Sequence, residues 1–247
     1  MYLKIRGLVL RITDYNDRDA LITLLTEDRG RITVKARGLR RKNSPLAAPC
    51  QLLSFGEFMV FEYKDSFTIN EAHTITLFEG LRKDLQKLAL GTYFAQVAEL
   101  ISQEDLPSPA LLSLTLNCLY ALSEFSVDEK QVKSVFELKC ACLAGYEPNL
   151  TACHICGNQL ADRFHLSDGV LECVGCRNAL DNGIRLPVDN GTVDAMRYIT
   201  SCDRKALFRF RVSESTLQQL SQITESYLVT QLEKGFSALD FYKTLLI

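Results

Sequence analysis

Cys153-His154-Ile155-Cys156 and Cys173-Val174-Gly175-Cys176 are two C-x2-C pairs, and we expect the surrounding fold to depend on them. Sixteen residues separate the pairs, a spacing typical of a tetrahedral zinc site. Each pair can place two thiolates on one side of a metal ion, so the intervening chain must fold back. Ser167-Asp168-Gly169 is a turn signal between two short strand-like runs, 163–166 and 170–172, and it predicts a hairpin that returns the chain to the metal.

The full set of four sulfur ligands predicts a structural zinc, one per chain, because no coordination position stays open for a substrate. Redox exchange by one pair is the alternative, but it requires a helix start in a βαβ setting, and no such pattern surrounds either pair. His154 and His165 are close in sequence, but sulfur already satisfies the spacing. The remaining cysteines lack a partner pair and are interpreted as small buried hydrophobes: Cys50, Cys118, Cys140, Cys142 and Cys202.

The composition is that of a soluble globular protein, with 47% hydrophobic and 23% charged residues in 247. The first residues contain no apolar signal region, and the longest apolar stretch, 110–125, is too short and too polar to span a bilayer. We therefore expect no membrane association and a reducing cytoplasm, where paired cysteines are metal ligands more often than disulfides.

The charge is distributed unevenly along the chain. Residues 1–42 contain eleven Lys or Arg against five Asp or Glu, although the whole chain has a net charge of −2. Such a concentrated positive segment indicates a polyanionic partner, whereas an isolated charge run is often only a solvated strand face. Residues two apart on a strand share a face, which favours a continuous basic surface here. We predict that it binds nucleic acid through Arg29, Arg31, Lys35, Arg37, Arg40, Arg41 and Lys42.

The pattern of the chain predicts an α+β fold. Residues 1–79 have the period of β-structure, and five short strands in this length suit an OB-like five-stranded barrel. Residues 80–247 have mainly helical periodicity and form the second predicted domain, with an inserted four-cysteine zinc-ribbon module at about 150–180. The expected strands are 3–11, 20–26, 31–37, 55–63 and 67–75, and the expected helices are 81–101, 109–122, 128–144, 190–201 and 213–234.

The sequence contains no constellation typical of catalysis, so we expect a protein that is not an enzyme. It lacks the G-x4-G-K-[ST] phosphate loop and the H-x-E that zinc deaminases place before their cysteine pair. Aromatic side chains that could stack on bases are Tyr15, Phe58 and Tyr63, although aromatics in small barrels more often fill the core. Arg82, Lys83 and Lys87 are further candidates to extend a nucleic-acid path.

Three stretches of the chain together resemble the RecO family of DNA repair proteins, and the resemblance covers essentially the whole chain. They are the opening Asp14-Tyr15-Asn16-Asp17-Arg18-Asp19, the stretch Ala36-Arg37-Gly38-Leu39-Arg40-Arg41, and Gly145-Tyr146-Glu147-Pro148-Asn149-Leu150 just before the first cysteine pair.

The resemblance implies a recombination mediator that binds single- and double-stranded DNA and anneals complementary strands without ATP. It also implies work with RecR and with the C-terminal tail of single-stranded-DNA-binding protein to load RecA, in the bacterial cytoplasm and near the nucleoid. Two other classes stay open: an RNA- or transcription-associated zinc-ribbon protein, and an adaptor whose basic face docks an acidic protein tail.

Overall fold

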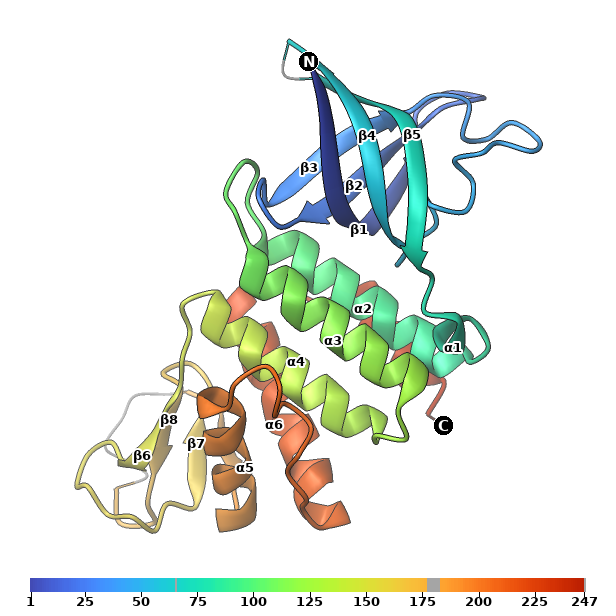
Figure 1. The fold of residues 1–247 in the computed structure, drawn as a ribbon. Helices are drawn as coiled ribbons and strands as arrows, with labels where there is room; N and C mark the ends of the chain where they lie inside the picture. The colour runs from blue at the N-terminus through green and yellow to red at the C-terminus, as the bar shows by residue number, and fades with distance from the viewer. Residues whose placement is uncertain (65, 177–182, 247) are drawn as a thin grey trace. The chain divides into compact units, whose positions relative to one another are not determined.

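The computed structural model describes residues 1–64, 66–176 and 183–246, and it contains a β-rich N-terminal part followed by helices (Figure 1). The chain divides into two compact units. The first contains Met1–Phe125 and Phe236–Ile247, and the second contains Ser126–Gly235. The predicted division between residues 79 and 80 falls inside the first unit, and as a domain boundary it stays a prediction.

A closed five-stranded barrel with the strand order β1-β2-β3-β5-β4 begins the first unit. Neighbouring strands are antiparallel except β3 and β5, which pair in parallel through Val34–Phe67 and Lys35–Thr68. All five predicted strands are present, with somewhat different ends: β1 Tyr2–Asp14, β2 Ala20–Thr26, β3 Arg31–Ala36, β4 Phe55–Tyr63 and β5 Ser66–Thr76.

Alternation along the strands builds the barrel core. Side chains at every second position, among them Ile5, Ile22, Val34 and Val60, point inward and are buried. The intervening positions carry the charged and aromatic side chains of the outer wall. The alternation in the sequence therefore determines which residues of each strand lie on the outer surface of the barrel.

Helix α2 is the centre of the helical part of the first unit. Asp84 caps its first turn by accepting hydrogen bonds from the N–H groups of Gln86 (2.9 Å) and Lys87 (3.2 Å). The helix packs against the barrel strand β1 and against three other helices, which explains why Tyr93 and Phe94 are fully buried. The helices of this unit are α1 Glu79–Arg82, α2 Leu85–Ile101, α3 Pro109–Glu124 and α7 Ser237–Thr244.

The turn between β2 and β3 fits tightly against the connection between α2 and α3. Gly30 has a φ of 57°, and a Cβ at this position would lie 2.1 Å from the Leu106 carbonyl oxygen. Only glycine meets both conditions, because a side chain would be strained and would collide with backbone. The N–H of Arg31 donates to the Gln103 carbonyl (2.9 Å) and continues this contact.

The second unit combines three longer helices with a four-stranded sheet of order β6-β8-β7-β9. The predicted hairpin is confirmed, because Arg163 pairs with Glu172 and His165 with Val170 across the turn at Gly169. The helix pattern is also confirmed, since Val132, Val135, Phe136 and Cys140 of α4 are fully buried. The elements are α4 Glu129–Leu143, β6 Asn149–Cys153, β7 Arg163–His165, β8 Val170–Glu172, β9 Arg185–Pro187, α5 Asn190–Ser201 and α6 Glu214–Leu232.

A buried ion cluster joins α4 to α6. The Lys133 ammonium group lies 3.0 Å from a Glu137 carboxylate oxygen and 2.9 Å from one of Glu225. Thr224 donates a further hydrogen bond to Glu137 (2.8 Å). Burial raises the pKa of Glu137, and the Lys133 charge opposes that rise. Removing one member would leave a buried charge uncompensated, so the cluster fixes how the two helices pair.

No helix in the described ranges combines the length and the apolar character that crossing a membrane requires.

Candidate functional site

The loop between β1 and β2 and the loop that follows β3 meet at one end of the barrel, where the Asp19 carboxylate contacts both. Asp19, at the end of the β1–β2 loop, accepts a hydrogen bond from the backbone N–H of Gly38 (2.9 Å). Its other oxygen lies 3.4 Å from the Lys35 ammonium group and 3.1 Å from the Asn16 amide. The loop that follows β3 is therefore held against the β1–β2 loop.

Arg40 strengthens the same junction. Its backbone N–H donates to the Arg18 carbonyl (3.1 Å), and its guanidinium group donates to the Asn16 carbonyl (3.0 Å). The guanidinium group also pairs with Asp14 at 3.2 Å. Arg40 thus joins its own loop to two residues of the β1–β2 loop and to the end of β1, while its side chain stays 43% exposed.

The cations gathered here outnumber the acids. Arg18, Arg37, Arg41 and Lys42 are exposed, and none of them forms an ion pair within the part of the chain that the structure describes. The nearby carboxylates are Asp14, Asp17 and Asp19, of which two are engaged as above. A surplus of uncompensated cations on preorganised loops suits phosphate binding. We call this surface the basic end, and it consists of Arg18, Lys35, Arg37, Arg40, Arg41 and Lys42.

Arg18 is the member of the basic end that sequence reasoning missed. It lies between Asp17 and Asp19, so the local sequence has a net negative charge and does not indicate a basic surface. Its membership follows from the hydrogen bond between the Arg40 N–H and the Arg18 carbonyl, which joins segments about twenty residues apart. A pairing of this kind was not visible in the sequence pattern.

Arg29 and Arg31 lie outside the basic end. Arg29 pairs with Glu62 at 3.4 Å and lies over the Phe67 ring, 5.6 Å from its centroid. Arg31 donates to the Glu99 carbonyl (2.8 Å) and pairs with Glu104 at 3.5 Å. Both guanidinium groups therefore connect elements of the first unit, and their contact with DNA stays a prediction. Arg82, one of the further candidates, similarly donates to the carbonyls of Leu77 and Leu52.

The structure separates the three aromatic candidates. Tyr15 is 57% exposed in the β1–β2 loop, and the Lys35 ammonium group lies 4.4 Å from the centroid of its ring. Tyr63 is 60% exposed at the end of β4. Phe58 is fully buried in the barrel core and has no face available for a base. The core interpretation therefore holds for Phe58, while Tyr15 extends the basic end with a stacking surface.

The clamp at Asp19 should depend on pH. The Gly38 N–H, followed by the Asn16 amide, lowers the pKa of Asp19 below its ordinary value of 3.8. Because the folded-state pKa is the lower one, the clamp contributes fully above 3.8 and is lost as the pH falls through the folded-state value. We expect the Gly38 amide to stay protected from hydrogen exchange from neutral pH down to 3.8, and to lose protection only as the pH falls below this value. Amide exchange followed by NMR measures this.

Asp19→Ala should remove the same protection at neutral pH, because it leaves the Gly38 N–H without its acceptor. Asp17→Ala is the matched control, since this neighbouring carboxylate is exposed and forms no ion pair with any described residue. Equal protection of Gly38 in both variants would show that Asp19 does not hold the loops together.

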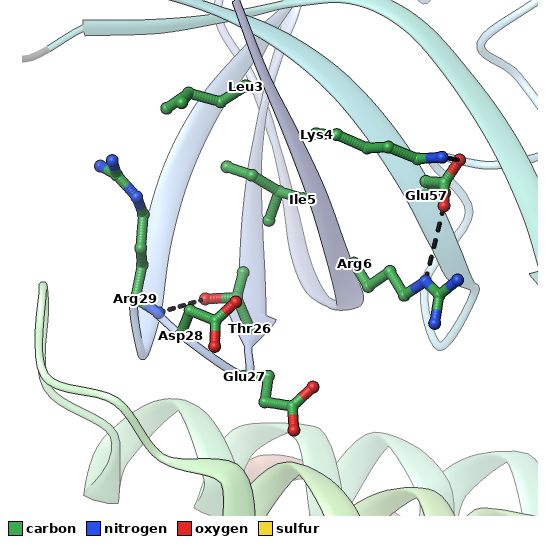
Figure 2. A pocket seen from close by; sticks show the side chains of 9 residues that line it. All are labelled: Leu3, Lys4, Ile5, Arg6, Thr26, Glu27, Asp28, Arg29 and Glu57. Carbon is green, nitrogen blue, oxygen red and sulfur yellow. Dashed lines mark hydrogen bonds and ion pairs between the residues drawn. The ribbon is translucent and has the colours of Figure 1, made fainter.

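A cavity of about 380 Å³ opens elsewhere on the barrel wall, between β1 and the β2–β3 turn (Figure 2). Three cations and three carboxylates line it, so its charge is balanced. Lys4 and Arg6 both turn toward Glu57, at 2.8 and 3.5 Å (Figure 2). The three cations of this cavity already form ion pairs within the protein, so they are less available to a phosphate than the cations of the basic end that are unpaired among the described residues. Its charged lining residues are Lys4, Arg6, Glu27, Asp28, Arg29 and Glu57.

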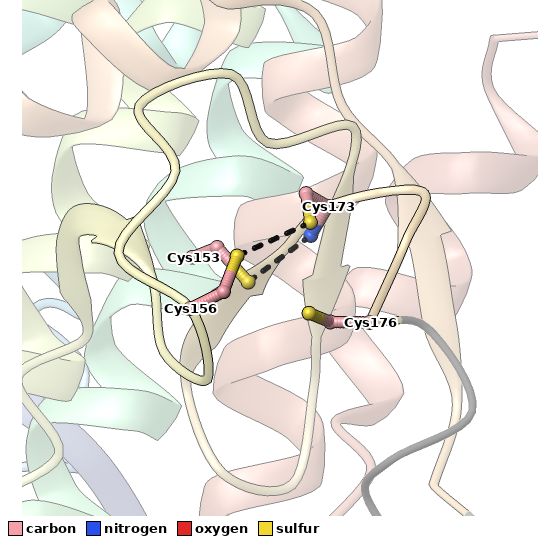
Figure 3. A group of neighbouring side chains, drawn as sticks. All are labelled: Cys153, Cys156, Cys173 and Cys176. Carbon is pink, nitrogen blue, oxygen red and sulfur yellow. Dashed lines mark hydrogen bonds between the residues drawn. The ribbon is translucent and has the colours of Figure 1, made fainter.

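The second site is the cysteine cluster, where all four predicted sulfurs come together. The Sγ atoms of Cys153, Cys156, Cys173 and Cys176 lie within 4.8 Å of one another and turn toward a common centre (Figure 3). Strand β6 ends at Cys153, and Cys173 directly follows β8. These two strands pair, with Cys153 beside Leu171, and this pairing brings the cysteine pairs together. The four cysteines can hold a metal ion.

The electrostatics of the cluster fit a divalent cation. Burial disfavours the Cys153 thiolate, but the N–H groups of Cys156, Ile155 and Cys173 outweigh burial and lower the pKa of Cys153 to about 6. The pKa of Cys176 instead rises to about 12, chiefly through its hydrogen bond with Cys156. Four adjacent thiols therefore do not ionise together without a compensating positive charge, which a metal ion supplies.

The two histidines near the cluster are not part of it. Among the described residues, the group of potential metal ligands contains the four cysteines alone. His154 is exposed, and His165 is buried with its Nδ1 accepting the N–H of Asp168 (3.3 Å). Arg197 of α5 holds the module in place, since its guanidinium group donates to the carbonyls of Leu150 (2.7 Å) and Thr151 (2.9 Å).

The fold and these two sites define a protein with a basic barrel, a helical part and a cluster of four cysteines that can hold a metal ion. Two family models match the chain in this order. "Recombination protein O N terminal" matches residues 1–78, and "Recombination protein O C terminal" matches residues 82–240. The chain therefore belongs to the RecO family of DNA repair proteins.

Similar proteins named "DNA repair protein RecO" match nearly the whole chain. The one from Acetivibrio thermocellus is 35% identical over 99% of this chain and 97% of its own length. The one from Bacillus pumilus is 30% identical over 92% of this chain and 88% of its own. The one from Alkaliphilus metalliredigens is 26% identical over 98% and 99%, respectively.

Proposed function

We propose that this protein is a non-enzymatic recombination mediator that binds single- and double-stranded DNA through the basic end and anneals complementary strands without ATP. The observation that carries the proposal is the set of four exposed cations, unpaired among the described residues, on two loops that Asp19 and Arg40 hold together. Membership of the RecO family, whose relatives are named as DNA repair proteins, supports DNA as the ligand.

Annealing requires that the repulsion between two DNA strands be reduced, and the basic end is suited to this. Two DNA strands repel each other through their phosphates, and a cationic surface neutralises both while their base edges stay free to pair. The cations here lie on loops fixed to a rigid barrel, so little order is lost when phosphates bind. Family membership further supports RecR and the tail of single-stranded-DNA-binding protein as partners, in the bacterial cytoplasm.

The architecture supports two finer assignments. The closed five-stranded barrel supports an assignment to the OB-fold, in which the β1–β2 loop borders the ligand surface. Tyr15 and Arg18 lie in that loop. The cysteine cluster supports a structural zinc of the ribbon type, because four sulfurs complete a tetrahedral site. The metal would hold the sheet of the second unit and take no part in DNA chemistry.

A strand-annealing assay without ATP tests the function. Complementary strands are first coated with single-stranded-DNA-binding protein, and pairing is followed by fluorescence transfer between end labels. We expect the wild-type protein to speed pairing well above the spontaneous rate, and Arg18→Glu with Arg37→Glu to abolish the gain. RNA strands of the same sequence in parallel reactions separate a DNA mediator from an RNA-binding protein, since equal activity on both would contradict the assignment to DNA.

A further inference from the structure

Three large aromatic side chains lie exposed together on the outer wall of the barrel, away from the core. Tyr2 of β1 is 62% exposed, and Phe61 and Tyr63 of β4 are 40% and 60% exposed. The rings of Tyr2 and Phe61 touch, with centroids 5.2 Å apart. Phe61 and Tyr63 are two residues apart on one strand and so share a face. We call Tyr2, Phe61 and Tyr63 the aromatic face.

Strand register connects the aromatic face to the basic end. Lys35 pairs with Thr68 across β3 and β5, Thr68 pairs with Phe61 across β5 and β4, and Phe61 pairs with Tyr2. All four side chains point outward, because their neighbours Val34, Ile69, Val60 and Leu3 belong to the core side. They form one row across four strands, about 14 Å long at the usual strand spacing.

A cation lies over an exposed tyrosine ring both at the basic end and at the aromatic face. At the basic end the Lys35 ammonium group lies over the Tyr15 ring, and beside the aromatic face Lys64 lies 5.3 Å from the centroid of the Tyr63 ring. Lys64 is exposed and forms no ion pair with another described residue. Phosphate-binding cations interleaved with stacking rings are the features that hold single strands without sequence preference.

We propose that the aromatic face continues the nucleic-acid path of the basic end, so that one single strand crosses Thr68 and stacks its bases on Phe61, Tyr63 and Tyr2. The inference rests on the proposed function, because it assumes that the basic end holds the strand first. The aromatic face then lengthens the binding site around the barrel. It provides stacking, whereas the basic end provides charge, so the two parts respond to different tests.

Tryptophan reporters test the path directly, because the chain contains no Trp. Phe61→Trp and Tyr63→Trp each place a single reporter on the aromatic face, and Tyr120→Trp, at a site 50% exposed on α3, is the control. The probes are oligothymidylates of increasing length, and anisotropy of an end label measures their binding separately. We expect short oligothymidylates to bind without changing the emission. Longer ones should quench the two reporters on the aromatic face but not the control.

Affinity provides the second readout. The combined variant Tyr2→Ala, Phe61→Ala, Tyr63→Ala should bind short oligothymidylates with the affinity of the wild type. For longer oligothymidylates it should lose about tenfold in affinity for each base that no longer stacks. Long oligothymidylates that bind with unchanged emission and unchanged length dependence would overturn the aromatic path while leaving the basic end intact. If no oligothymidylate binds the wild-type protein, the path and the proposed function both fail.

Discussion

Replacing Arg37, Arg41 and Lys42 together with glutamate should weaken single-stranded DNA binding on the order of a hundredfold, because three phosphate contacts become repulsions. The salt dependence should flatten as well, since each lost contact removes about 0.7 from the slope of log affinity against log salt, or about 2 in all. Fluorescence anisotropy titrations at four or five salt concentrations measure both quantities. These three side chains are exposed and unpaired among the described residues, so the substitutions break no ion pair seen there.

A charge-matched variant makes this result specific. Arg204→Glu, Lys205→Glu and Arg211→Glu change the net charge equally, and these three residues are exposed in the second unit, with side chains that form no ion pair to described residues. The matched variant should keep most of the affinity. A loss of equal size in both variants would mean that net charge, and not the basic end, governs DNA binding.

Loss of one metal ligand should have the largest effect on stability. Cys173→Ser leaves three sulfurs at the cluster, and structural zinc sites of this kind contribute about 10–16 kcal/mol of apparent binding free energy in small zinc-dependent domains. We expect the purified wild-type protein to contain about one zinc per chain and the variant to contain none. The amides of β6 and β8 should then exchange rapidly, since the proposed metal would connect Cys153 at the end of β6 with Cys173 directly after β8.

Cys202→Ser is the control for the metal prediction, because Cys202 is half-buried and lies outside the cluster. It should keep the zinc and the exchange protection of the sheet. DNA binding by the basic end should survive in both variants if the metal is only structural. Metal-free wild-type protein with a fully protected sheet would contradict the assignment of a structural metal.

The elements that the sequence predicts well are those whose pattern is local. Five alternating strands and the main helices follow from periodicity and caps, as at Ser213, whose hydroxyl accepts the Thr216 N–H at the start of α6 (3.2 Å). The four cysteines were also predictable, because the spacing of metal ligands is itself a local pattern. Helix α7 was missed, since it has only eight residues and no side-chain cap at its start.

What the sequence did not predict depends on contacts between distant segments. Arg31 has the strand position of a surface cation, yet it donates to the Glu99 carbonyl 68 residues away. Lys133 and Glu137 look like an exposed helix pair, yet both are buried because α6 brings Glu225 and Thr224 to them. In each case a residue far along the chain determines whether the charged group is buried and what it contacts. The local residue pattern does not identify that distant residue.

The contact between α7 and α2 has a consequence for how the molecule is made. Gln86 donates to the Leu245 carbonyl (2.7 Å), Gln96 accepts the Ala238 N–H (3.2 Å), and Phe236 packs edge-on against Tyr93. The first unit thus closes with residues synthesised after the whole second unit. During synthesis on the ribosome, the second unit can therefore fold before α7, which completes the first unit, has been synthesised. Until residues 236–246 emerge, the part of the α2 surface that they cover stays exposed to solvent.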